Sequence, residues 1–202
     1  EKDLIIPETM VKHIAKIFDG EYNVNYAHPS PVILDIGANI GGFSRWATHR
    51  WAGCEIHCYE PINRNFNLLK TNLCDLNNIH LHKYGIAKAN ENRKMYYGLN
   101  NIGEASLYKV HDSMNEGETV EIKAASGLPE ANILKIDTEG AEVEIISNMK
   151  IKPDIILIEY HSNENRRLIE DILSEYILIS IQSTGLGHGI VKYVKQSITS
   201  LS

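Results

Sequence analysis

The sequence predicts an α/β fold: an open, mainly parallel sheet with helices on both faces and a C-terminal antiparallel hairpin. Three observations lead to this prediction. An apolar run at 32–36 passes through a glycine-rich turn into a helix-like pattern, which is how a βαβ unit begins. Later apolar runs alternate with helical patterns, as parallel strands and crossover helices do. The last two runs, 177–182 and 190–194, are joined by a link too short for a helix, so we expect an antiparallel pair.

The N-terminal part is predicted to begin with a helix. Pro7 suits a first helical turn, apolar residues recur on one face as far as Phe18, and Gly20 ends the pattern. We expect residues 1–31 to form this helix and a lid-like extension, within a single domain that spans 1–202.

The other elements follow from apolar periodicity bounded by turn residues. Lys152-Pro153 ends one helix, because proline cannot continue it. The segment 88–123 has strand-like stretches at 94–97 and 119–123, and we expect a hairpin-like excursion or loops there. The strands are expected at Val32–Ile36, Glu55–Tyr59, Ile79–Tyr84, Ile133–Asp137, Ile155–Glu159, Ile177–Gln182 and Ile190–Val194, and the helices at Pro7–Phe18, Phe43–Trp51, Ile62–Leu73, Ala141–Met149 and Asn163–Tyr176.

The turn after the first strand indicates which kind of nucleotide binds. Asp35, Gly37, Asn39 and Gly41 give the spacing D-x-G-x-N-x-G. Asn39 stands where a dinucleotide site needs its second glycine, so close approach of a pyrophosphate is disfavoured. Asp35 would repel a phosphate and suits a cation. A ligand that combines an amino-acid cation with a ribose fits both facts, and S-adenosylmethionine is such a ligand; the alternative is a turn that only packs a helix on the sheet.

A second signal follows the second strand, which ends in Glu60-Pro61. An acid about 20 residues beyond the glycines is the spacing expected for a carboxylate on ribose hydroxyls. An ionised carboxylate only accepts hydrogen bonds, so Glu60 can take both protons of a diol. Pro61 suits the start of the next helix. Further on, Gly85-Ile86-Ala87 is expected to end the third strand on the side where an adenine would lie.

Composition narrows the range of possible functions. The net charge of −6, from 20 basic and 26 acidic residues, argues against a broad nucleic-acid-binding surface. The three cysteines, Cys54, Cys58 and Cys74, have neither metal spacing nor an even number, so we expect reduced thiols in a cytoplasmic protein. No run approaches the ~18 apolar residues of a membrane helix, and no signal-like segment is visible.

Three motifs together resemble the FkbM-type S-adenosylmethionine-dependent methyltransferases, which have a Rossmann-like class I methyltransferase fold. They are DIGANIG at 35–41, YEP at 59–61 and KIDTEGAE at 135–142, and KIDTEGAE is the most specific. The resemblance covers about 32–161. It implies methyl transfer to an oxygen, often a hydroxyl of a saccharide or a small natural product. One departure is that ASGLPEAN at 125–132 replaces a Leu-Asp pair that the family often has before the fourth strand.

Candidate site residues converge at the carboxyl ends of the strands, where open α/β sheets bind ligands. Asp137 is the first candidate for the acceptor side and could also hold the cofactor's ammonium group. Glu139 is a second candidate, although a carboxylate in a helix's first turn is also favoured by the dipole. His161 could be a general base, since an unperturbed imidazole titrates near pH ~6.5. The proposed cofactor-binding set is Asp35, Gly37, Ala38, Asn39, Gly41, Glu60, Pro61 and Asp137, and the proposed catalytic set is Asp137, His161 and Glu139.

Three further features have structural interpretations beside functional ones. Lys135 lies inside a strand and is expected to pair with a carboxylate, because burying an unpaired ammonium is prohibitive. His80 and His82 mimic a metal pair but lack a third ligand, so we interpret them as strand surface. We assign no metal, although Asp137, Glu139 and Glu159 offer hard oxygen ligands that could hold Mg²⁺, with His161 beside them.

Three functions remain open at this point. The first is an O-methyltransferase that acts on a small hydroxylated or saccharide acceptor. The second is an RNA methyltransferase, which would bind RNA with a steep salt dependence. The third is a nonenzymatic cofactor-binding module, which any turnover would exclude.

Overall fold

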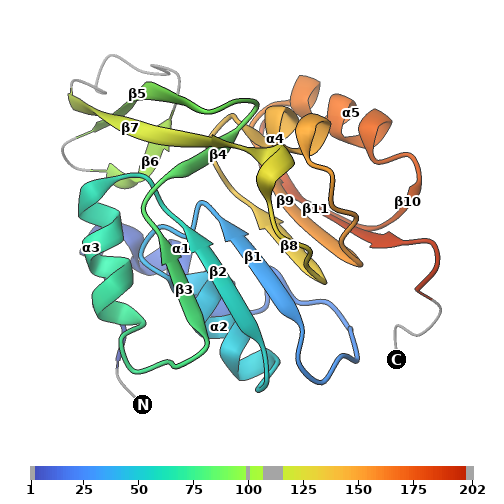
Figure 1. Ribbon diagram of the computed structural model, residues 1–202, viewed down its shortest axis with the longest axis horizontal. Coiled ribbons are helices and arrows are strands. Elements are labelled where there is room, and N and C mark those ends of the chain that lie inside the picture. The colour runs from blue at the N-terminus through green and yellow to red at the C-terminus, as the bar shows by residue number, and fades with distance from the viewer. Residues whose placement is uncertain (1–2, 99–100, 107–115, 199–202) are drawn as a thin grey trace.

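The computed structural model describes residues 3–98, 101–106 and 116–198, and it has a seven-stranded central sheet (Figure 1). The strand order is β10-β11-β9-β8-β1-β2-β3, with every pairing from β9 to β3 parallel and β11 antiparallel to both of its neighbours. This confirms the predicted fold class, including the C-terminal hairpin. The strands are β1 (Val32–Ile36), β2 (Glu55–Tyr59), β3 (Ile79–His82), β8 (Ile133–Ile136), β9 (Ile155–Tyr160), β10 (Tyr176–Gly185) and β11 (His188–Lys195).

Helices cover both faces of this sheet. Because side chains alternate along a strand, Ile33 of β1 packs in one core while its neighbour Leu34 packs in the other. The first core includes Trp46 of α2 and Leu69 of α3, and the second includes Ile145 of α4. The helices are α1 (Val11–Phe18), α2 (Gly42–Arg50), α3 (Asn63–Asn72), α4 (Glu142–Asn148) and α5 (Asn163–Ile172), with 3₁₀ turns η1 (Glu8–Met10) and η2 (Ala125–Gly127).

A second, four-stranded sheet includes strands from the segment 88–123, where the sequence predicts a hairpin-like excursion or loops. Its order is β4-β7-β5-β6, formed by β4 (Gly85–Ala87), β5 (Glu91–Gly98), β6 (Asn101–Ser106) and β7 (Glu116–Ala124). The expected strand-like stretches lie in β5 and β7, which pair antiparallel. Residues 85–87 do not continue the third strand, because β4 pairs in parallel with β7 instead. A small separate hydrophobic core there includes Met95, Val120 and Ile122. The burial of these side chains stabilises the second sheet.

The N-terminal segment packs against the main domain. Met10, Ile14 and Ile17 are buried in the same core as α2. Gly20, at φ +97°, ends α1 in the left-handed region that glycine enters without strain. Among the described residues, no helix has the length and apolar character that crossing a bilayer requires.

Candidate active site

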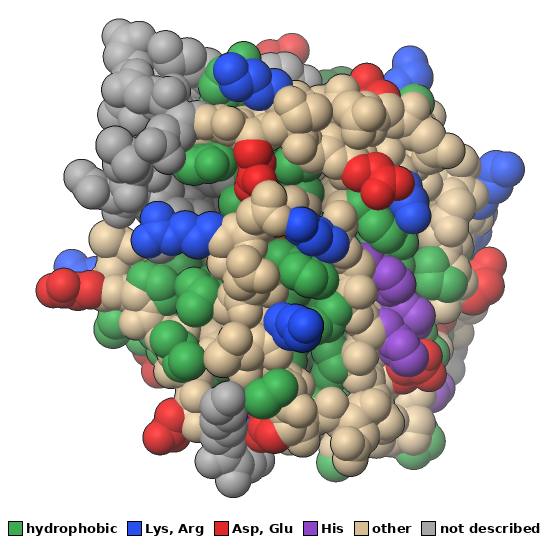
Figure 2. Space-filling view, turned by 60° about the vertical axis from the view of Figure 1, so that its left-hand side comes forward, with side chains coloured by type: hydrophobic (Ala, Val, Ile, Leu, Met, Phe, Trp, Pro, Cys, Tyr) green, Lys and Arg blue, Asp and Glu red, His purple; other side chains and the backbone are tan. Residues whose placement is uncertain are grey.

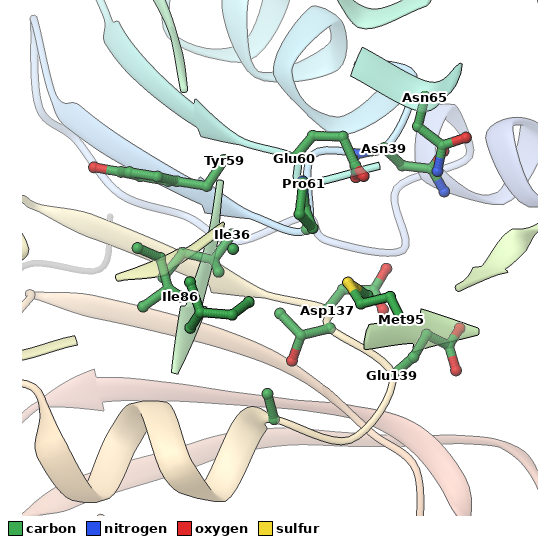
Figure 3. A pocket seen from close by; sticks show the side chains of 15 residues that line it. Ile36, Asn39, Tyr59, Glu60, Pro61, Asn65, Ile86, Met95, Asp137 and Glu139 are labelled. Atoms are coloured by element: carbon green, nitrogen blue, oxygen red, sulfur yellow. The ribbon is translucent and has the colours of Figure 1, made fainter. Parts of the chain in front are cut away.

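A cavity opens at the carboxyl ends of the parallel strands β1, β2 and β8. The glycine turn after β1, the end of β2 and the turn after β8 form three of its sides. The second sheet contributes the fourth, through β4, Met95 of β5 and Ile122 of β7. In Figure 3, Glu60 and Pro61 face Asp137 and Glu139 across this space. The cavity therefore joins part of the proposed cofactor set with two of the three proposed catalytic residues. Its lining includes Gly37, Asn39, Glu60, Pro61, Asp137 and Glu139, but not Asp35, Ala38, Gly41 or His161.

The turn after β1 has an unusual backbone. Gly37, Asn39 and Gly41 have φ values of +79°, +51° and +92°. Asparagine is one of the few residues that tolerate this left-handed region, which explains why Asn39 can stand among glycines. Gly37 also has no room for a side chain, since an added Cβ would lie 1.7 Å from the carbonyl oxygen of Asp137. The turn is thus pressed against the end of β8, and its Asn39 borders the cavity.

Glu60 closes the cavity on the β2 side. Its side chain is buried, with Oε2 accepting from the Asn39 N–H at 3.0 Å and Oε1 accepting from the Ile62 N–H at 2.8 Å. Burial raises the pKa of Glu60 to about 7, although the two backbone donors oppose this. Each carboxylate oxygen has more than one acceptor position, so the group can take further donors from a ligand.

Asp35 lies apart from this cavity, which differs from the expectation that it faces a ligand's cation. Its side chain is fully buried, lies 3.1 Å from Lys135 Nζ and accepts from Ser44 Oγ at 2.6 Å. Lys135 also donates to the Gly37 carbonyl at 2.8 Å. The predicted ion pair of Lys135 is therefore confirmed, with Asp35 as its partner. Asp35 is already neutralised inside the protein, and it supports the turn through Lys135.

Asp137 and Glu139 come from the turn after β8 and both line the cavity. Glu139 has φ +55°, a left-handed conformation that is uncommon for glutamate and that clusters at functional sites. Glu142 stabilises this turn through hydrogen bonds. Its Oε1 accepts from the Gly140 N–H at 2.9 Å and from Thr138 Oγ1 at 3.1 Å. Its place in the first turn of α4 suits the helix dipole, and these contacts add a structural role.

His161 follows β9 and is surrounded by carboxylates. Its Nδ1 lies 3.1 Å from Glu142 Oε1, and its Nε2 lies 3.2 Å from Glu139 Oε2 and 4.0 Å from Asp137 Oδ1. Burial opposes the charged form, but the hydrogen bonds to Glu139 and Glu142 outweigh it and raise the pKa of His161 to about 11. A pKa of about 11 favours the imidazolium at neutral pH, and this cation would hold the carboxylates in place. The general-base role expected for His161 stays a prediction from the sequence.

Two more groups stand beside His161. The His188 ring meets the His161 ring edge to face, with centroids 5.5 Å apart. Glu159 is close to the hydroxyl of buried Tyr22, whose oxygen lies 3.4 Å from Glu159 Oε2. Burial and the nearby charge of Asp137 raise the pKa of Glu159 to about 8. The site therefore gathers several carboxyl groups around the His161 ring.

The ligand atoms of Asp137, Glu139 and His161 lie within 4.8 Å of one another, which is close enough to hold a metal ion. These residues are part of the Mg²⁺ set considered from the sequence.

The cavity has the chemistry that an adenosyl amino acid requires. Glu60 offers acceptors for a sugar diol, and the buried Oδ1 of Asn39 finds no hydrogen-bond partner within the described part of the chain. Pro61, Ile86 and Tyr59 supply an apolar surface for a base. The polar groups and walls fit S-adenosylmethionine better than a pyrophosphate, since Asn39 occupies the place where a phosphate would need bare backbone.

Sequence reasoning missed the wall that the second sheet provides. Met95 and Ile122 line the cavity, yet both lie in the segment that could not be placed from the sequence. The alternation of Val120 and Ile122 indicates an inward-facing strand face, but nothing local to it indicates what that face covers. Asn65, also in the lining, carries no motif signal, and Thr138 belongs to the KIDTEGAE motif but has no role of its own predicted from the sequence.

Comparisons with known proteins agree with this geometry. Residues 35–177 match the family described as the methyltransferase FkbM domain. A curated protein, the 2-O-methyltransferase NoeI of Sinorhizobium fredii, is 25% identical over 182 residues, covering 75% of this chain and 74% of that protein.

Solved structures are similar in fold. One is fibrillarin from Aeropyrum pernix with natively bound S-adenosyl-L-methionine (TM-score 0.53, 12% identity, 91% of this chain and 74% of that chain). Another is a candidate RNA methyltransferase from Pyrococcus horikoshii (TM-score 0.56, 13% identity, 98% of this chain and 92% of that chain). At these identities the likeness concerns the fold.

Proposed function

Because the chain belongs to the FkbM methyltransferase domain family, we propose that this S-adenosylmethionine-dependent methyltransferase methylates a hydroxyl oxygen of a saccharide or another small hydroxylated natural product. The observation that carries the proposal is the shared cavity. Glu60 and Asn39 line one side of it, and Asp137 and Glu139 line the other. A hydroxyl bound beside these carboxylates has a proton acceptor next to the place where the cofactor is expected.

When bound, S-adenosylmethionine supplies an activated methyl group on its sulfonium. Glu60 would accept the ribose hydroxyls, and Pro61, Gly37, Ala38 and Asn39 would border the nucleoside. Asp35 and Gly41 would act indirectly: Asp35 anchors Lys135 beneath the turn, and Gly41 begins α2 in a left-handed conformation. Asp137 would face the amino-acid part as well as the acceptor, since it follows β8 directly and lines the cavity.

The acceptor hydroxyl must lose its proton as the oxygen attacks. We assign this step to the carboxylate of Asp137, with Glu139 as its neighbour. His161 is the positioning residue, because its cationic ring lies 3.2 Å from Glu139 and 4.0 Å from Asp137. This cation fixes the two carboxylates before the acceptor arrives, which reduces the cost of ordering them in the transition state.

The N-terminal residues 1–31 are proposed as a lid-like extension of the single domain. Tyr22 supports this proposal. It is fully buried, and its hydroxyl oxygen lies 3.4 Å from Oε2 of Glu159, on the side of the site where the acceptor is expected. Excluding water there would strengthen every electrostatic contact in the site.

Transfer of the methyl group to an oxygen is supported by the relative NoeI, a 2-O-methyltransferase, and the RNA alternative comes from the Pyrococcus horikoshii structure, a candidate RNA methyltransferase. The net charge of −6 favours the small acceptor, because RNA binding depends on clustered basic residues.

A panel assay tests the proposal. The protein is incubated with methyl-labelled cofactor and, separately, with mono- and oligosaccharides, polyhydroxylated small molecules, amines and total RNA. We expect label only with hydroxylated small molecules, and mass spectrometry of the product should place the methyl group on oxygen. Label that appears in RNA, and falls steeply with added salt, would contradict the proposal, and so would methylation of nitrogen.

A further inference from the structure

A cluster of histidines lies on the outer part of the main sheet, away from the active-site cavity. Strands β2 and β3 pair in parallel, with His57 directly opposite His80. Their neighbours Ile56 and Leu81 pack in the core with α2 and α3, so the histidines point to the opposite face. The view in Figure 2 shows histidine side chains gathered in a row beside acidic ones.

Glu55 brings a carboxylate to the two rings. His57 Nε2 lies 3.3 Å from Glu55 Oε1, and His80 Nε2 lies 3.1 Å from the same oxygen. The two imidazoles are stacked, with centroids 4.6 Å apart and planes inclined by 22°. Potential ligand atoms of the three residues all lie within 4.8 Å of one another. The further ligands that His80 needs are therefore supplied by β2, from Glu55 and His57.

The spacing suits a tetrahedral metal ion. Zinc binds imidazole nitrogen and carboxylate oxygen at ~2.0–2.2 Å, so the edges of a regular tetrahedron around it measure ~3.3–3.5 Å. The two nitrogen–oxygen distances at Glu55, 3.3 and 3.1 Å, are close to this edge. An ion needs only small side-chain movements to bind, and Glu55 and His80 are half exposed, which gives them room to move.

A second set of contacts orients the first. His57 Nδ1 lies 3.1 Å from His82 Nε2, and His82 Nδ1 lies 3.3 Å from the hydroxyl of Tyr84. Metal-bound histidines almost always engage their other ring nitrogen in this way, because the contact fixes the tautomer and the ring orientation. In the tautomer whose Nδ1 proton is directed to His82, the lone pair of His57 Nε2 faces Glu55, and a cation between the two would be bound by both.

We propose that Glu55, His57 and His80 form a site for a divalent transition metal, of which Zn²⁺ is the best match. Two neutral imidazoles and one carboxylate leave a fourth position for water. β3 is the edge strand of the main sheet, and the ion would tie it to β2 through ligands on both strands. The proposal does not depend on the methylation chemistry, because none of these residues lines the active-site cavity.

Zinc titration of the metal-free protein tests this site. The chain is stripped with a chelator, and Zn²⁺ alone is added in competition with a chromophoric chelator. We expect one tight site in the wild type, at least tenfold weaker binding in His80→Gln and in Glu55→Gln, and wild-type affinity in His49→Gln, an exposed histidine on α2. The unfolding temperature should rise with Zn²⁺ in the wild type and in His49→Gln, but not in His80→Gln.

Two further variants distinguish this site from the acidic cluster around His161. His82→Phe keeps an aromatic ring but removes the contact to His57 Nδ1, and it should weaken zinc binding about 10- to 100-fold. Asp137→Asn alters the potential ligands around His161 and should leave zinc affinity unchanged. Wild-type affinity in both His80→Gln and Glu55→Gln would overturn the proposal. So would a loss of binding confined to Asp137→Asn, or no binding to the wild type at about 100 µM Zn²⁺.

Discussion

The backbone N–H of Asn39 donates a 3.0 Å hydrogen bond to Oε2 of Glu60, and so joins the turn after β1 to the end of β2. Oε1 of the same carboxylate accepts from the Ile62 N–H at 2.8 Å, at the start of α3. Glu60 is thus held from both sides before any ligand binds. A preorganised acceptor of this kind binds a sugar diol without the cost of ordering a flexible side chain.

The raised pKa of Glu60 predicts that cofactor-product affinity depends on pH. Only the carboxylate can accept both hydroxyl protons of a diol, and burial raises its pKa to about 7. Affinity for S-adenosylhomocysteine should therefore fall as the pH drops below 7, approaching tenfold per pH unit. Calorimetry between pH 5.5 and 8.5 measures this, with Glu60→Gln expected to give a much flatter profile. An equally steep profile in Glu60→Gln would assign the titration to another group.

Glu60 should also make the free energy of unfolding depend on pH, in the opposite direction from the ligand affinity. Since the folded pKa of Glu60, about 7, exceeds its ordinary value of 4.5, its contribution is present at low pH and is lost as the pH rises through 7. Bound ligand should reduce this loss.

Asp137→Asn should lower turnover at saturating cofactor by about 10²–10⁴-fold, because it removes the proposed proton acceptor. Affinity for S-adenosylhomocysteine should fall as well, by about tenfold, since the same carboxylate is expected to face the amino-acid part of the cofactor. Steady-state kinetics and calorimetry separate the two effects. Glu164→Gln, an exposed acid in the first turn of α5, is the matched control. Full turnover in Asp137→Asn would remove Asp137 from the chemistry.

His161 should stabilise the fold as a cation. Its pKa is about 11 in the folded protein against an ordinary value of 6.5. The contribution is fully present below pH 6.5 and is lost as the pH rises through 11. Urea unfolding should show wild-type stability declining from pH 7 to 10 more steeply than that of His161→Gln, which we expect to be about 1–3 kcal/mol less stable at pH 7. The double change His161→Gln with Glu142→Gln should recover part of that loss, and strictly additive effects would argue against the coupling.

Lys135→Met should destabilise the protein by about 3–5 kcal/mol, because it leaves the buried carboxylate of Asp35 without its cation. The side chains of both residues are almost fully buried, and their charged atoms lie 3.1 Å apart. Adding Asp35→Asn should relieve a large part of the loss, since the unpaired charge is then gone. Lys152→Met, at an exposed pair with Glu175, should change stability by less than about 0.5 kcal/mol in the same unfolding assay.

The parts of the fold that could be predicted are those encoded within a short stretch of the sequence. The first strand, its turn and its helix are encoded within 32–51, and they appear where the sequence placed them. The sequence predicts that the partner of Lys135 is a carboxylate, because a buried ammonium group needs an opposite charge. That the partner is Asp35 depends on the register of β1 and β8, and a single sequence does not encode register locally.

The rest depends on contacts between distant segments. The second sheet pairs β4 with β7 in parallel, and local periodicity says nothing about such a partner. The charge of His161 likewise follows from Glu139 and Glu142, which reach it from another turn of the chain. An imidazole considered alone titrates near neutrality, which is why the sequence suggests a base and says nothing of the carboxylates that raise the pKa of His161.

Calorimetric titration of S-adenosylhomocysteine into the wild type, Glu60→Gln and the exposed control Glu175→Gln tests the central assignment most directly. Glutamine keeps one acceptor oxygen but puts an amide group against a backbone N–H, so a charged hydrogen-bonding group worth about 1.5–3 kcal/mol is lost. We predict one site in all three proteins, with the control equal to the wild type and Glu60→Gln about 10- to 100-fold weaker. Equal affinity in Glu60→Gln, with its fold intact by circular dichroism, would contradict the assignment of the ribose to Glu60.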